Sequence, residues 1–206
     1  MGKVTEIEMR GPIDKAELET LRNELNGRAT LKEVKNRVLI DYTTLLEGQD
    51  IENRSTDIRV RNTNGKSEII VKTGKWGGSD IRNEFKVSTT DSFDSLVQVM
   101  RLLGYTKGVL CVRNSEVYQL GEVEIALVEV PGHSYYFEAE IETEDEHDAN
   151  ELSKRIIEKI SGLGLQIFSD EDFYAYIREL NENANTVFDT KDEPSDFFRK
   201  KFNVWH

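Results

Sequence analysis

Residues 4–10 read Val-Thr-Glu-Ile-Glu-Met-Arg, and charged and apolar side chains alternate along this stretch with a period of two. Such a period is typical of a β-strand, because successive side chains of a strand point to opposite faces. One face therefore carries Glu6, Glu8 and Arg10, while the other face is apolar. The question for the rest of the chain is therefore in which direction such ionised faces point.

The same alternation returns in later segments. We predict further strands at residues 36–46, 57–62, 67–73, 81–88, 108–113, 116–128 and 134–143. The second and third of these form a hairpin around Asn64-Gly65, a strong signal for a tight turn. Their polar faces are also ionised, with Arg59, Arg61, Glu68, Lys72, Arg82, Glu84, Lys86, Arg113, Glu122, Glu124, Glu138, Glu140 and Glu142.

Amphipathic helices are predicted between and after these strands. They cover residues 13–27, a segment capped by Asp91 and ending near Leu103, residues 148–161 and residues 170–182. The order of elements indicates an α+β fold with a largely antiparallel sheet. We place one domain at residues 1–185 and assign residues 186–206 to a linker and a tail. The tail carries Phe197, Phe198, Phe202 and Trp205, a spacing that favours docking on the domain.

Two interpretations explain the ionised faces. In the first, an open sheet has one face on the core and the other in water. In the second, a closed barrel holds the charges inside while helices cover its apolar exterior. Enclosed charges are costly unless they are paired or bind ions. In the barrel, carboxylates would suit Mg²⁺ or Mn²⁺, and arginines would suit a phosphate chain.

Composition narrows the classes of partner and compartment. The 206 residues include 27 basic and 39 acidic side chains, a net charge of −12, which argues against nucleic acid or an anionic membrane as a general partner. The single cysteine, Cys111, excludes an internal disulfide and fits a reducing compartment. With no signal peptide or apolar membrane span evident, we expect a cytoplasmic protein. The oligomeric state stays open, and a homodimer is one option.

Four ordered motifs resemble those of a known family. They are Glu6-Ile7-Glu8-Met9-Arg10; then Ile58-Arg59-Val60-Arg61 with Val71-Lys72-Thr73-Gly74; then Arg82-Asn83-Glu84; and finally Leu127 to Glu140. Over about residues 3–180 they resemble the CYTH superfamily of triphosphate tunnel metalloenzymes. This superfamily includes class IV adenylyl cyclases, thiamine triphosphatases and inorganic triphosphatases, and its first motif has lysine where this chain has Arg10.

The resemblance implies a closed eight-stranded antiparallel tunnel that holds Mg²⁺ or Mn²⁺ and a triphosphate substrate. Carried over by position, the metal ligands would be Glu6, Glu8, Glu138 and Glu140, and Glu6 or Glu8 would also take part in catalysis. The phosphate ligands would be Arg10, Arg59, Arg61, Lys72, Arg82 and Arg113, while Glu84 would position a basic side chain. The chain departs from the family pattern at Cys111, usually basic, at Val128, usually aspartate, and at His133-Ser134, usually Leu-Gly.

The resemblance implies an enzyme, with three alternatives for what the site does. A metal-dependent triphosphatase is the first, because it requires the fewest special features. A cyclase that makes cyclic AMP and pyrophosphate is the second, although it should also bind adenine, for which Trp76 and Tyr118 are the candidates. The third is a phosphate-chain-binding module without catalysis, which the departures at Cys111 and Val128 favour.

Overall fold

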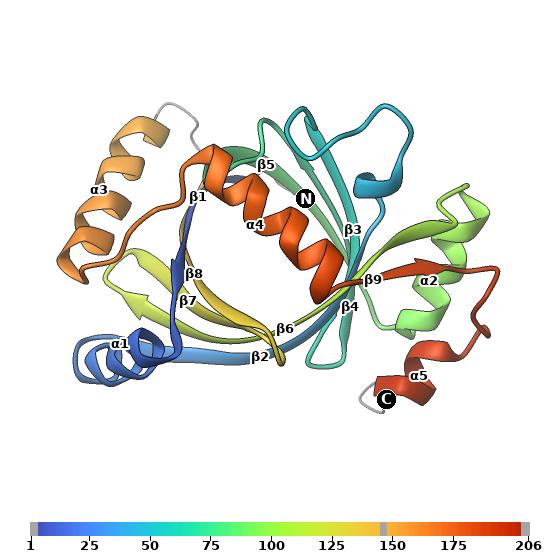
Figure 1. Ribbon diagram of the computed structural model, residues 1–206, viewed down its shortest axis with the longest axis horizontal. Coiled ribbons are helices and arrows are strands. Elements are labelled where there is room, and N and C mark those ends of the chain that lie inside the picture. Colours follow the sequence, from blue (N-terminus) through green and yellow to red (C-terminus); the bar gives the residue numbers. More distant parts are fainter. Residues whose placement is uncertain (1–3, 145–147, 203–206) are drawn as a thin grey trace.

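The ionised strands close into a barrel. The computed structural model describes residues 4–144 and 148–202. Its strands follow the spatial order β2-β3-β4-β5-β1-β8-β7-β6, and β6 pairs with β2 to complete an eight-stranded antiparallel barrel (Figure 1). This confirms the predicted fold class. The strands are β1 (Val4–Ile13), β2 (Thr30–Asp41), β3 (Thr56–Thr63), β4 (Lys66–Thr73), β5 (Ser79–Thr89), β6 (Lys107–Leu120), β7 (Val123–Val130) and β8 (Ser134–Thr143).

Helices surround the barrel and cover much of its apolar exterior. They are α1 (Lys15–Arg28), α2 (Phe93–Leu102), α3 (Ala149–Gly162), α4 (Asp170–Asn183) and α5 (Phe197–Phe202). Leu21 of α1 and Ile156 of α3 are buried in one core with the outer faces of β1, β7 and β8. A second core places α2 and α5 over the outer faces of β2, β3 and β6. The outer face of β5 is an exception, since Phe85 and Val87 are about half exposed.

Several predicted boundaries were wrong. The second strand is β2, and it begins at Thr30 and ends at Asp41, after which Thr43–Leu45 form a 3₁₀ turn. Residues 108–113 and 116–128 do not form two separate strands, because β6 continues to Leu120 and the break falls at Gly121, where φ is +67°. Ser92, rather than Asp91, caps α2 by accepting a hydrogen bond from the backbone of Ser95.

The carboxyl-terminal segment contains more regular structure than a linker. Thr186–Asp189 form strand β9, which pairs with β6. Beyond it, α5 packs on α2. The ring centroids of Phe198 and Phe93 lie 4.8 Å apart there, with an angle of 81° between the ring planes. A carboxylate oxygen of Asp94 accepts the backbone N–H of Phe198 at 3.0 Å. Trp205 lies outside the described residues, and the division of the chain at residue 185 stays a prediction.

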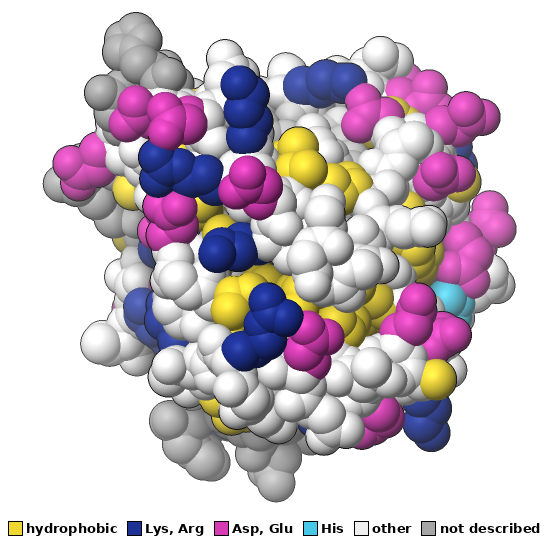
Figure 2. Space-filling view, turned by 90° about the vertical axis from the view of Figure 1, so that its left-hand side faces the viewer, with side chains coloured by type: hydrophobic (Ala, Val, Ile, Leu, Met, Phe, Trp, Pro, Cys, Tyr) yellow, Lys and Arg dark blue, Asp and Glu magenta, His cyan; other side chains and the backbone are white. Residues whose placement is uncertain are grey.

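The exterior mixes both signs of charge. On the face that carries α1 and α3, Lys, Arg, Asp and Glu side chains are interspersed around a central hydrophobic area (Figure 2). None of the helices within residues 4–144 and 148–202 is long and apolar enough to cross a bilayer. Inside the barrel, by contrast, acidic side chains gather on one part of the wall and basic side chains on another.

Gly11 sits where a strand and the segment before α4 approach each other closely. A Cβ at this position would lie 1.8 Å from the carbonyl oxygen of Gln166 and 2.5 Å from the ring of Phe137. We expect Gly11→Ala to lower the free energy of unfolding by about 1–3 kcal/mol or more, since overpacking displaces backbone. Urea unfolding measures this change. The matched control is Gly27→Ala in α1, where nothing lies within 4 Å and the change should be neutral or stabilising.

Candidate functional site

A cavity of about 260 Å³ occupies the interior of the barrel. Side chains from all eight barrel strands line it, and the charged rows therefore face one another across a common space. Helix α4 crosses the barrel opening in Figure 1 and adds Phe173, Tyr176 and Leu180 to the lining. A chain of hydrogen bonds ties this helix to the β7–β8 turn. Tyr176 and Ser134 hydroxyls lie 2.8 Å apart, His133 Nδ1 lies 2.8 Å from Ser134 Oγ, and His133 Nε2 lies 2.6 Å from Glu179.

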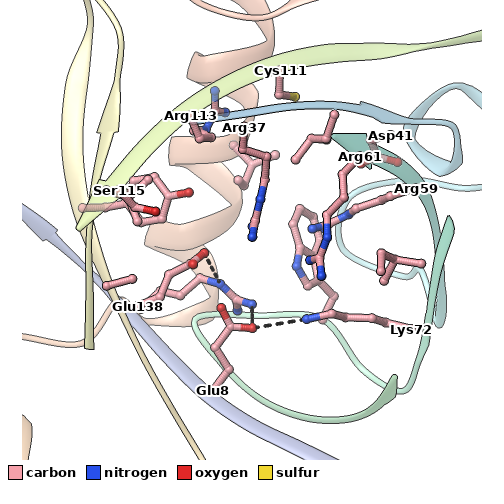
Figure 3. Close-up of a pocket in the computed structure, with 18 of the residues that line it drawn as sticks. Glu8, Arg37, Asp41, Arg59, Arg61, Lys72, Cys111, Arg113, Ser115 and Glu138 are labelled. Atoms are coloured by element: carbon pink, nitrogen blue, oxygen red, sulfur yellow. Dashed lines mark ion pairs between the residues drawn. The ribbon is translucent and has the colours of Figure 1, made fainter. Parts of the chain in front are cut away.

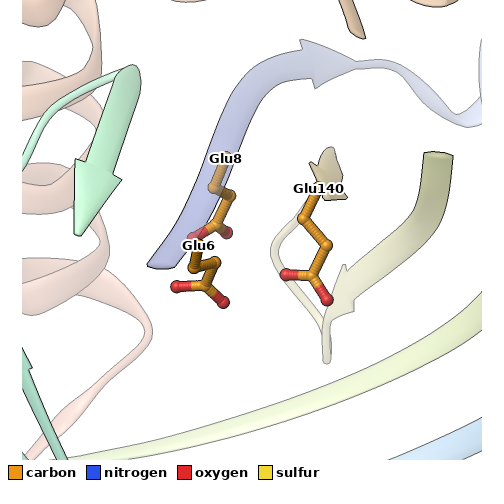
Figure 4. A group of neighbouring side chains, drawn as sticks. All are labelled: Glu6, Glu8 and Glu140. Carbon is orange, nitrogen blue, oxygen red and sulfur yellow. The ribbon is translucent and has the colours of Figure 1, made fainter. Parts of the chain in front are cut away.

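Carboxylates are concentrated on one wall of the cavity. The pairing of β1 with β8 sets Glu8 opposite Glu140, and the pairing of β7 with β8 sets Glu124 opposite Glu140. One carboxylate oxygen from each of Glu6, Glu8 and Glu140 lies within 4.8 Å of the others (Figure 4). Glu138 also lines the cavity but lies outside this group, with its Oε1 3.7 Å from Nε of Arg10. The structure thus groups three of the four carboxylates that the sequence pointed to.

Cations are concentrated on the opposite wall. Arg59 and Arg61 of β3, Lys72 of β4 and Arg113 of β6 all line the cavity (Figure 3). Strands β4, β3, β2 and β6 are consecutive neighbours in the barrel, so these cations come from one arc of it, and β6 also borders β7. A polyanion bound between the walls would contact the arginines on one side, and a cation held by the carboxylates would face it from the other.

Most of these cations are already paired with carboxylates of the protein. Arg59 forms an ion pair with Asp57, and Lys72 forms one with Glu6. Lys72 Nζ also lies 3.5 Å from Oε2 of Glu84, whose positioning role stays a prediction. Buried ion pairs hold side-chain geometry when each charge has a partner. The cavity is therefore preorganised before any ligand enters.

Two predicted phosphate ligands are held within networks of the protein. Arg10 is buried, pairs with Glu8 and donates from NH1 to Asp80 at 2.8 Å and to the carbonyl of Gly77 at 2.9 Å. Arg82 is 1% exposed and lies outside the residues that line the cavity. Its NH1 donates to Asp57 at 3.2 Å. Arg82 thus sits behind the wall, where it orients Asp57 rather than facing the cavity directly.

The three grouped carboxylates have different acidities. Burial raises the pKa of Glu8 to about 8, and the charges of Glu138 and Glu6 add to this effect against the opposing Arg10. Burial, Glu6 and Glu8 likewise raise the pKa of Glu140. Burial also acts to raise the pKa of Glu6, but Lys72, Arg82 and Arg10 together outweigh it and lower that pKa to about 2. Like charges at this separation cannot all be present without a compensating cation.

Sequence reasoning missed several residues of the site. Asp57 is 2% exposed and pairs with Arg59, and Arg54 stacks on Trp76 with its guanidinium carbon 3.6 Å from the ring centroid. Arg37 and Tyr136 line the cavity. Asp57 lies two positions before Arg59, so the period of two could have found it. Arg37 lay inside the strand predicted at residues 36–46, but it was not singled out because Leu39 interrupts the row of ionised residues on that face.

The departures from the family pattern also fall on the cavity wall. Cys111 and Val128 both line the cavity. Burial raises the pKa of the Cys111 thiol to about 11, against the opposing effect of Arg113, so the thiol is protonated at neutral pH. These two positions supply neither a cation nor a carboxylate. A bound phosphate chain or metal ion would therefore have to be held by the other charged residues of the cavity.

Glu68 holds Arg61 in place and should make stability depend on acid. Its carboxylate accepts from Nε of Arg61 at 2.8 Å and from the Ser88 hydroxyl at 2.9 Å. Burial acts to raise the pKa of Glu68, but Arg61, Ser88 and Lys66 together outweigh it and lower the pKa from the ordinary value near 4.5 to about 2. The folded state thus binds this proton less readily than the unfolded state, so the contribution of Glu68 is complete above pH 4.5 and lost towards pH 2.

We therefore expect Glu68→Gln to flatten the fall of unfolding free energy between about pH 4.5 and pH 2. A single group can contribute a slope of at most about 1.4 kcal/mol per pH unit. Urea unfolding at several pH values measures the slope, and the same substitution at exposed Glu47 is the matched control. Identical slopes in wild type and Glu68→Gln would contradict the assignment.

A closed antiparallel barrel with one acidic and one basic interior wall defines the chain as a tunnel-type barrel protein. The CYTH domain family matches residues 5–174, and the chain belongs to this family. The family includes triphosphatases and adenylate cyclases, and its enzymes depend on divalent metals and bind triphosphate substrates. The comparison with curated proteins gives no significant match.

Solved structures share this fold at low identity. The PH1819 protein of Pyrococcus horikoshii is 21% identical with a TM-score of 0.68, covering 86% of this chain and 98% of that one. The PH1012 protein of the same organism is 20% identical with a TM-score of 0.62, covering 82% and 93%. An adenylate cyclase candidate from Vibrio parahaemolyticus is 15% identical with a TM-score of 0.61, covering 87% and 99%.

Proposed function

We propose that the protein is a divalent-metal-dependent triphosphatase that hydrolyses a linear triphosphate or a compound ending in one. One observation carries the proposal, namely that a cluster of three carboxylates faces a wall of arginines within one cavity. Phosphoryl transfer needs little covalent participation by the protein, and it depends on positioning and on offsetting the charge of the transferred group. Two facing walls of opposite sign meet both needs.

The carboxylate group fits a divalent cation. Glu6, Glu8 and Glu140 provide hard oxygen ligands of the kind that Mg²⁺ and Mn²⁺ prefer, and all three come from rigid strands. Their crowding in a buried setting leaves negative charge that Lys72 and Arg10 offset only in part. A bound divalent ion would polarise phosphate oxygens and lower the pKa of a bound water. Glu138, on the same strand as Glu140, is placed to hold Arg10 rather than to join this group.

The arginines supply binding and orientation. Arg59 and Arg61 lie two positions apart on β3, so both project from the same face of the strand. Each planar guanidinium can hold two phosphate oxygens at once. Asp57 and Glu68 fix their orientation from behind the wall. The phosphate chain would therefore be bound in a defined register, with Arg113 contacting it from β6.

The two candidate residues for binding a nucleotide base are packed against other side chains. Trp76 is buried, stacks with Arg54 on one side and meets the edge of Phe173, with ring centroids 4.9 Å apart. Tyr118 is 1% exposed and belongs to the outer core packed by α1 and α3. Tyr118 does not line the cavity, and Trp76 lines it but is only 5% exposed and is covered by Arg54, which favours hydrolysis over cyclisation.

A product assay tests the proposal. The purified protein is incubated with tripolyphosphate, thiamine triphosphate and ATP, each with Mg²⁺, with Mn²⁺ or with excess EDTA. We expect release of inorganic phosphate from at least one substrate with metal, and none with EDTA. Pyrophosphate together with cyclic AMP would instead indicate a cyclase. Tight binding of triphosphates without turnover would leave a non-catalytic binding module.

A further inference from the structure

Arg37 on β2 projects into the cavity from the basic wall. Strand β2 alternates Lys35, Arg37, Leu39 and Asp41 towards the interior, and all four line the cavity. In Figure 3, Arg37 points into the open space between Arg113 and Arg61, across from Glu8. The β2–β6 register sets Arg37 directly opposite Arg113. Two arginines thus face the same space from adjacent strands.

These two arginines differ from the other cations of the wall. Arg59, Arg61 and Lys72 each form an ion pair with a carboxylate of the protein. Within residues 4–144 and 148–202, Arg37 has no carboxylate at ion-pair distance, and its Nε donates to Thr63 Oγ1 at 3.0 Å. Arg113 likewise has none there, and it donates to the carbonyl of Val112 and to Asn185 Oδ1.

Such a pair is unfavourable in the ligand-free protein. Like charges directly opposite each other on neighbouring strands destabilise a sheet. Enclosed cations without counterions cost further free energy. Burial and the nearby charge of Arg61 lower the pKa of Arg37 against the opposing charges of Glu138 and Glu140, whereas Tyr136 raises the pKa of Arg113 against burial. A bound anion would give Arg37 the direct counterion that it lacks among the described residues.

We propose that Arg37 and Arg113 together form an anion subsite that binds a phosphate group of the substrate, with Arg37 as a binding residue additional to those of the sequence motifs. This inference rests on the proposed function and names the part of the cavity that holds one end of the phosphate chain. The two guanidinium forks supply donors from β2 and β6, while Arg61 supplies donors from β3. A phosphate held there lies across the cavity from Glu8.

The test combines ligand binding with ligand-free stability. Calorimetric titration with a non-hydrolysable imido analogue of tripolyphosphate, in the presence of Mg²⁺, compares wild type, Arg37→Gln, Arg37→Lys and Arg101→Gln. The last variant removes the same charge from the exposed surface of α2 and is the matched control. We expect Arg37→Gln to weaken binding at least tenfold and Arg37→Lys to weaken it less, with no change in Arg101→Gln.

Thermal unfolding without ligand separates binding from a structural role. Because Arg37 lacks a counterion, Arg37→Gln should unfold at the same temperature as wild type or higher, whereas loss of a structural arginine would lower it. Wild-type affinity in Arg37→Gln would overturn the subsite and leave the triphosphatase proposal standing. If Arg37→Gln both unfolds at a lower temperature and binds the analogue more weakly, the subsite would also be overturned, because the weaker binding would then follow from a structural role of Arg37. Absence of binding by the wild type would overturn both proposals.

Discussion

Glu8→Gln should reduce triphosphatase turnover by roughly 10²–10³-fold, the range seen when one charge-stabilising group is removed from an active site. Glu8 contributes an oxygen to the three-carboxylate group at the centre of the acidic wall. Its amide replacement keeps the size of the side chain but binds a divalent cation much more weakly. The same variant should lose the rise in unfolding temperature that Mg²⁺ or Mn²⁺ gives the wild type.

The fold should survive this substitution. Glu8 lies among like charges, so neutralising it removes repulsion from Glu6 and Glu138, while Arg10 keeps its pair with Asp80. Circular dichroism and the metal-free unfolding temperature check this. The matched control is Glu122→Gln, which makes the same change at an exposed residue paired with Arg155. A wild-type rate in Glu8→Gln would remove Glu8 from the metal site.

Lys72→Met should lower the free energy of unfolding by about 3–5 kcal/mol when no metal is present, as expected when a buried charge loses its partner. Lys72 is 6% exposed, pairs with Glu6, and has its Nζ 3.8 Å from Glu8 and 3.5 Å from Glu84. Without the ammonium, the buried carboxylates of Glu6, Glu8 and Glu84 lose a positively charged neighbour. Methionine fills a similar volume, so the loss reports charge rather than packing.

A second substitution checks this explanation. In a Lys72→Met background, Glu6→Gln should recover part of the lost stability, because it removes one of the uncompensated charges. Urea unfolding of the two single variants and the double variant gives the coupling between the two sites. Lys107→Met, at an exposed lysine paired with Asp189, serves as the control. A loss below about 1 kcal/mol in Lys72→Met would place it with surface ion pairs and contradict the buried network.

The period of two allowed much of the barrel to be predicted. Ionised faces such as that of Glu6, Glu8 and Arg10 mark strands clearly, and the family motifs placed more than half of the charged residues that line the cavity. Closure could not be derived from alternation alone, because an open sheet with a wet face shows the same pattern. The pairing of β2 with β6 resolves this, and it depends on contacts distant in sequence.

Other features escaped because they depend on neighbours in space. Arg82 shares the alternation of the cavity residues, yet its contacts with Asp57 and Asp80 keep it behind the wall. The strand break at Gly121 was missed since β6 and β7 both read as one apolar-alternating run. Strand β9 was read as a linker because it is short and polar at its ends, and its pairing partner lies far earlier in the chain.

The contact that closes the ring also constrains the order of assembly. Thr30 to Asp41 must find Val109 to Gln119, so about one third of the chain lies between the two partners. Such distant pairing forms slowly, because loop-closure entropy opposes it before the contacts form. During synthesis on a ribosome, the amino-terminal half would remain an open sheet until β6 is made, with its future interior charges exposed to water. At that stage the charged side chains remain hydrated. The barrel closes only after its carboxylates and arginines have all been synthesised and can offset one another.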